Sequence, residues 1–148
     1  MSIETEINQS KFENEYVKVM LNIIYSSNWV SEKLKATFLQ EGITSQQYNI
    51  LRILRGANKP LSTLELRSRM LDKMSDTSRI VDRLVKKDFV KKTGSLLDKR
   101  LVDISIKQKG LLLLKKLDAN EIVLGEFCKN LSVAEAKTVS LLLDKMRG

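Results

Sequence analysis

A polar run in the middle of the chain carries side chains suited to close-range hydrogen bonding. Small hydroxyl groups come first, and two arginines follow at helical spacing. These side chains are Ser75, Asp76, Thr77, Ser78, Arg79 and Arg83. A hydroxyl forms hydrogen bonds without the desolvation cost of a charge, and a guanidinium reaches further and can grip paired acceptors. The run therefore suits recognition of a polar, negatively charged surface.

A second polar group, Asp98, Lys99 and Arg100, follows further along the chain. Arg100 is either a probe for a narrow groove of negative potential or a solvated arginine. Asp98 either holds that guanidinium by a charge-assisted hydrogen bond or forms a turn. In the first group, Asp76 either accepts from a cytosine amino group or caps a helix. Arg83 either contacts a phosphate or pairs with a nearby acid.

The chain has few of the residues that usually carry out catalysis. The chain has no histidine and one cysteine, Cys128. Ser-His and Cys-His nucleophile pairs are therefore excluded, and the usual zinc ligands are missing. No stretch gathers acidic residues in an apolar setting, as acid–base catalysis by carboxylates would require. We expect no enzyme activity, no metal site and no cofactor.

The positive charge is concentrated in one segment. The net charge is +8, and residues 67–109 hold 13 basic and six acidic residues, a balance of +7. A confined basic excess is the electrostatic pattern of a protein that binds a polyanion. A solvated, lysine-rich face explains the charge alone equally well.

Nothing in the sequence suggests a membrane protein. The longest apolar run, Leu111 to Leu114, is far shorter than the roughly 20 residues needed to cross a bilayer. The first ten residues are acidic and polar, without the apolar core of a secretory signal. We therefore expect a cytoplasmic protein.

The polar run lies in a predicted helix-turn-helix. Thr44-Ser45-Gln46-Gln47 and Ser62-Thr63-Leu64-Glu65 each have the capping-box pattern that begins a helix, and Gly56 is expected to end the first of these helices. A third helix is predicted from about Ser75 to Lys87. Its buried stripe is expected to contain Ile80, Val81 and Leu84, with Val85 as a further candidate.

A β-hairpin is predicted after these helices. Val102, Ile104 and Ile106 alternate with polar residues, which is typical of a half-buried strand. Residues 89–93 form a plausible partner strand. Asp98, Lys99 and Arg100 then fall at the hairpin tip, between residues 94 and 100.

Long amphipathic helices are predicted at both ends. One covers residues 12–38, with a possible bend at 26–28 and a stop at Gly42; another follows Gly110 to about Leu131, with an interruption near Ala119-Asn120. A capping box at Ser132–Glu135 begins the last helix. Such helices have little core to cover in a single chain, and pairing across a two-fold axis would bury them.

The central segments resemble the MarR family of bacterial regulators. The matching pieces are ITSQQYNILRIL at 43–54, LSTLEL at 61–66, SRIVDRLVKKDFV at 78–90, DKRLVDISIKQKG at 98–110 and LSVAEAKTVSLLLDKM at 131–146. The Asp-x-Arg wing motif of the family is present as Asp98 and Arg100. This sequence departs from the family pattern at Arg67, at Asp88 (usually glycine) and at Lys107 (usually a capping threonine).

The resemblance implies a mainly helical winged helix-turn-helix with a small β-hairpin wing. It implies a dimerisation helix at residues 1–40, a DNA-binding domain at 43–107 and dimerisation helices at 108–148. The expected partners are double-stranded DNA at a pseudo-palindromic operator and a second copy of the chain; a small-molecule effector is a further candidate partner. Regulation of transcription, as a ligand- or stress-responsive repressor, is the expected function. The alternative is a winged-helix protein–protein module without a DNA target.

Three further side chains could have functional roles. In the family, Tyr25 and Trp29 would lie where a ligand crevice can form, although packing in the core is the favoured interpretation. Some family members sense oxidants through a cysteine. Cys128 lies on the C-terminal side among apolar residues, and we expect it to be a buried structural thiol.

Overall fold

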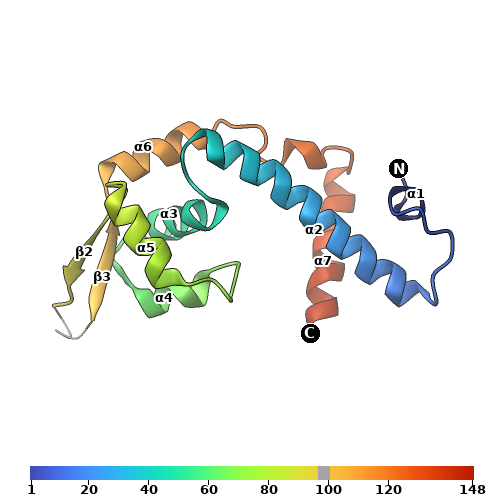
Figure 1. The fold of residues 1–148 in the computed structure, drawn as a ribbon, viewed down its shortest axis with the longest axis horizontal. Coiled ribbons are helices and arrows are strands. Elements are labelled where there is room, and N and C mark those ends of the chain that lie inside the picture. Colours follow the sequence, from blue (N-terminus) through green and yellow to red (C-terminus); the bar gives the residue numbers. More distant parts are fainter. Residues whose placement is uncertain (97–100) are drawn as a thin grey trace. The chain divides into compact units, whose positions relative to one another are not determined.

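The computed structural model describes residues 1–96 and 101–148 (Figure 1). The chain divides into two compact units, Met1–Ser45 and Gln46–Gly148. The fold class predicted from the sequence is confirmed: the chain is mainly helical, with one small antiparallel sheet. The elements in order are α1 (Ile3–Glu6), α2 (Glu15–Gln40), α3 (Ser45–Ala57), β1 (Leu61–Ser62), α4 (Thr63–Arg69), α5 (Thr77–Lys86), β2 (Val90–Gly94), β3 (Val102–Ile106), α6 (Gln108–Leu117), the 3₁₀ helix η1 (Glu126–Cys128) and α7 (Val133–Arg147).

The first unit is built around α2. The Asn14 side chain caps this 26-residue helix by accepting from the backbone N–H of Val17, and the helix continues unbroken through residues 26–28. Gly42, at φ +70°, follows its end, as the sequence predicted.

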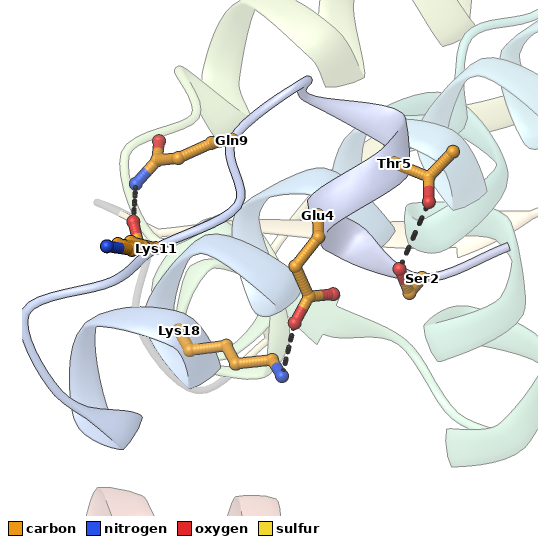
Figure 2. Close-up of polar contacts among 6 residues, drawn as sticks. All are labelled: Ser2, Glu4, Thr5, Gln9, Lys11 and Lys18. Atoms are coloured by element: carbon orange, nitrogen blue, oxygen red, sulfur yellow. Dashed lines mark hydrogen bonds and ion pairs between the residues drawn. The ribbon is translucent and has the colours of Figure 1, made fainter.

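The short helix α1 was not predicted. It packs on α2 with Ile3 buried. Glu4 forms an ion pair of 2.6 Å with Lys18 of α2, shown in Figure 2. This pairing lowers the pKa of Glu4 to about 2, chiefly through the hydrogen bond from Lys18.

The second unit contains the helix-turn-helix. The Ser62–Glu65 capping box is present at the start of α4, with both reciprocal hydrogen bonds formed. The three helices α3, α4 and α5 bury their apolar stripes together with the sheet. The buried side chains include Ile50, Leu51, Leu54, Leu61, Leu66, Met70, Ile80, Val81, Leu84 and Ile104.

Two details of these helices differ from expectation. Val85 is exposed and does not belong to the buried stripe of α5. Gly56 lies inside the last turn of α3, which extends to Ala57. Both differences are at helix ends, where the hydrophobic spacing defines the boundary least well.

The wing is a three-stranded sheet in the order β1-β3-β2. Strands β2 and β3 pair antiparallel, with Val90 opposite Ile106 and Gly94 opposite Val102. The two-residue strand β1, which was not predicted, adds Leu61 opposite Ile104. The sheet thus joins the wing to the beginning of α4.

The turn into β2 accommodates two of the departures from the family pattern. Asp88 has a positive φ of 64°, a conformation that aspartate tolerates better than most residues. Lys107 precedes α6 without a side-chain capping hydrogen bond and pairs with Asp88 instead. The two unusual residues therefore interact with each other and tie the beginning of β2 to the end of β3.

The C-terminal region is less helical than predicted. α6 ends at Leu117, close to the interruption predicted near Ala119-Asn120, but the helix expected to continue from there to about Leu131 does not form. The Asn120 side chain accepts from the backbone N–H groups of Ile122 and Val123, and turns and η1 occupy the following residues. The predicted capping box at Ser132–Glu135 is present and begins α7.

Candidate nucleic-acid interface

The first turn of α5 carries an arginine that projects into solvent. The Asp76 side chain caps the helix by accepting from the backbone N–H of Arg79 at 3.2 Å. The same carboxylate lies 3.4 Å from Nε of Arg79, whose side chain is 80% exposed. Asp76 therefore caps the N-terminus of α5 and pairs with the Nε edge of the Arg79 guanidinium. Ser78, beside it, is also exposed.

Thr77 is placed differently from the prediction. Its side chain is only 3% exposed, and its Oγ1 has no hydrogen-bond partner among the described residues. Thr77 precedes Ile80 by three residues and Val81 by four, so helical spacing puts it on the buried stripe of α5. That spacing was the signal that the sequence interpretation missed: Thr77 is mostly buried, although it still lines the surface beside the start of α5.

Ser75 serves the turn that leads into α5. It is half-buried, and its hydroxyl donates to the backbone carbonyl of Asp72 at 2.8 Å. The Asp72 carboxylate in turn accepts from the backbone N–H of Met74 at 3.0 Å. Ser75 thus shapes the approach to the helix, although it still lines the surface beside it.

Basic side chains continue along α5 and into the wing. Arg83 is exposed one turn after Arg79, and Lys91 is exposed on β2. Asp82 of α5 pairs with Lys92 of β2, and this hydrogen bond holds the pKa of the Asp82 carboxyl below its usual value. Because the Asp82–Lys92 pair is neutral, the net positive charge of residues 67–109 comes from the other charged residues and determines the electrostatic potential there.

A hollow of about 470 Å³ lies between α4 and the start of α5. It adds side chains that the sequence interpretation did not include in the site. Besides residues 75–78, its lining contains Thr63, Leu64, Arg67 and Met74. Met74 directly precedes the polar run, but only the fold brings Leu64 and Arg67 of α4 next to it.

The predicted wing-tip residues Asp98, Lys99 and Arg100 lie outside the described residues. The structure does describe the two strands that lead to them, β2 and β3. At the opposite end of this hairpin, Lys107 lowers the pKa of Asp88 through their hydrogen bond.

The remaining candidates lie elsewhere in the chain. Tyr25 and Trp29 are both partly exposed on α2, so the favoured prediction of core packing is wrong for the single chain. The Tyr25 hydroxyl donates to Glu6 at 2.6 Å, and the Lys33 ammonium lies 4.8 Å from the Trp29 ring centroid. Cys128 is exposed in η1, so the prediction of a buried structural thiol is wrong for the single chain.

The described part of the chain has neither a metal-binding cluster nor a membrane-spanning helix. No group of three or more cysteine, aspartate or glutamate side chains is arranged to hold a metal ion there. Among the same residues, no helix has both the length and the apolar character needed to span a membrane.

Comparison with known proteins agrees with this geometry. The model of the MarR family matches residues 43–102. No curated protein sequence matches the chain. A cysteine-to-serine mutant of E. coli MarR, solved with operator DNA, is 24% identical and has a TM-score of 0.79, covering 93% of this chain and 99% of its own.

Two further structures have the same fold. The organohalide-sensing transcriptional regulator RdhR, in its 2,4-dichlorophenol-bound form, is 19% identical with a TM-score of 0.80, covering 94% of this chain and 85% of its own. The apo form of wild-type E. coli MarR is 23% identical with a TM-score of 0.66, covering 93% and 98%. The winged helix-turn-helix domain of this chain therefore belongs to the MarR family, and the chain as a whole has the MarR fold.

Proposed function

We propose that this protein is a transcriptional regulator that binds a pseudo-palindromic DNA operator as a homodimer. The observation that carries the proposal is the solvent-exposed first turn of α5, where Ser78 and Arg79 project from a segment with a balance of +7. An α-helix fits the major groove, and its N-terminal turn meets base edges and phosphates. The operator-bound E. coli MarR structure, which has the same fold, supports this assignment.

Two exposed apolar faces support the homodimer. None of the 15 residues of α7 is buried in the single chain, although its stripe contains Val139, Leu142 and Met146. α2 likewise exposes Val19, Met20 and Ile24. Large exposed apolar faces mark interaction surfaces, and a second copy of the chain would cover both.

The proposed function has two further parts, a DNA contact by the wing and a response to an effector. Arg100, held by Asp98, enters the minor groove beside the recognition helix, with Lys99 near the phosphates. A small molecule or stress signal changes the spacing of the two recognition helices and releases a repressor from its site. Tyr25 and Trp29 are the proposed ligand contacts, and the dichlorophenol-bound form of RdhR supports an effector of this general kind.

Selection of bound duplexes from a random DNA pool tests this function. Because a dimer presents two identical recognition helices about 34 Å apart, we expect a two-fold symmetric consensus with half-sites one helical turn apart. Affinity for the selected duplex should also fall steeply with salt, since each neutralised phosphate releases counterions.

Failure of enrichment at low ionic strength would contradict the proposal. An affinity that does not respond to salt would instead favour the alternative, a winged-helix module that binds a protein. A scrambled duplex of the same length and composition is the control, because it separates the sequence-specific contribution from the general attraction of a basic surface.

A further inference from the structure

Two large apolar side chains are exposed to solvent beside α5, the proposed recognition helix. Leu64 of α4 is 75% exposed, and Met74, in the turn before α5, is 93% exposed. Both line the hollow between α4 and α5, together with Ser75 and Ser78. The helix-turn-helix thus presents an apolar pair within the surface proposed to meet DNA.

This pair does not contribute to the core. The inward-facing residues here are Leu66 of α4 and Met70, which directly follows α4; both are almost completely buried. Leu64 points to the other side of the helix, where Arg67 shares the hollow with it. A partner for the pair must therefore offer an apolar group beside hydrogen-bonding groups, because the neighbouring side chains are hydroxyls, the Arg67 guanidinium and the Asp76 carboxylate.

Duplex DNA offers one such group. In the major groove the C5-methyl of thymine is the apolar feature of the base edges, and phosphates flank it on both sides. Methionine suits such a contact, because its unbranched, polarizable side chain adapts to an irregular surface. The serine hydroxyls of the same hollow can bond to neighbouring base edges or phosphates.

We propose that Leu64 and Met74 contact thymine methyl groups in the major groove and give each half-site a preference for A·T pairs at defined positions. This inference rests on the proposed function and deepens it, because it names the base feature that the hollow recognises. A uracil-containing duplex provides the probe, since uracil has the same hydrogen-bonding edge and lacks only the methyl group.

The experiment measures affinity for the selected duplex with every thymine in turn replaced by uracil. Burial of one methyl group corresponds to about a fourfold gain in affinity. We expect a loss of about this size at one or two positions per half-site for the wild type. In Met74→Ala and Leu64→Ala the loss should disappear at the position that each side chain contacts. Both residues are exposed, so neither change should affect folding.

Leu71→Ala is the matched control. Leu71 is also 80% exposed and lies close in sequence, but it is outside the hollow, so its variant should keep the full thymine–uracil difference. The inference is overturned if the wild type binds the thymine and uracil duplexes equally, or if the difference survives in both alanine variants. If no duplex is selected at all, the proposed function itself fails; this outcome is distinct from binding without a uracil effect.

Discussion

At the scale of single residues, the proposed recognition depends on how α5 begins. Asp76 accepts from the backbone N–H of Arg79 and also lies 3.4 Å from its Nε. One carboxylate therefore caps the helix and orients the guanidinium. Two interpretations of Asp76 were open from the sequence, and the structure favours the capping role. Because Asp76 lies against Nε, the two terminal nitrogens of Arg79 can donate to a guanine edge or a phosphate.

Replacement of Arg79 tests this arrangement. Arg79→Ala should weaken binding to the selected duplex by about 10- to 100-fold and relax specificity at one base position in each half-site. Thermal stability should hardly change, because the side chain is 80% exposed. Fluorescence anisotropy with labelled duplex measures the affinity.

The control for charge is Lys11→Ala, which removes one positive charge from an exposed side chain that precedes α2 and is remote in sequence from α5. If the two variants lose affinity equally, Arg79 acts only through the net charge of the protein, and the base contact would have to be abandoned.

At the scale of elements, the packing of α6 against the wing depends on Gly110, which has no side chain. A Cβ added at Gly110 would lie 2.7 Å from the carbonyl oxygen of Phe89 and 2.9 Å from Cγ1 of Ile106. Real Cβ atoms do not approach backbone oxygen so closely, so α6 and the strand β2 would have to separate. The glycine thus fixes how the wing is held on the domain.

Two glycine-to-alanine variants provide a test of this packing. Gly110→Ala should lower the free energy of unfolding by about 1–3 kcal/mol, the usual cost of overpacking. Gly56→Ala is the matched control, because nothing lies within 4 Å of its added Cβ and it is helical. The control should raise the free energy of unfolding by about 0.5–1 kcal/mol. Urea denaturation measures both, and equal shifts in the same direction would contradict the packing argument.

Elements defined by local hydrogen bonds were predictable from the sequence. The boxes at Ser62–Glu65 and Ser132–Glu135 join residues three apart, so the pattern alone locates the helix starts. The alternation of residues 102–106 likewise gave β3. Elements that depend on distant partners were not predictable. Strand β1 exists because Leu61 pairs with Ile104 across the chain.

The candidate site was predictable in its location and less so in its members. The polar run identified α5, and the exposure of Ser78 and Arg79 agrees with it. Composition misled at Thr77, because a polar residue was taken as surface although its spacing places it in the core. Leu64 and Met74 were missed because their proximity is created by the turn between the two helices.

At the scale of the whole molecule, the exposed apolar residues of α7 are the main support for the proposed homodimer. These residues lie on two sides: Leu142 belongs to the stripe with Val139 and Met146, and Leu141 lies away from that stripe. If the dimer buries this stripe, a charged side chain should be tolerated at Leu141 but not at Leu142. Leu142→Glu should produce a single chain of 16.9 kDa, whereas Leu141→Glu should leave the dimer intact.

The most direct test is the mass of the complex with the selected duplex, measured by sedimentation equilibrium for the wild type and these two variants. For the wild type and Leu141→Glu, two chains should bind each duplex, and Leu142→Glu should bind weakly as one chain. A wild-type complex with a single chain per duplex, or no complex at low ionic strength, would contradict a two-fold dimer that places two recognition helices on DNA.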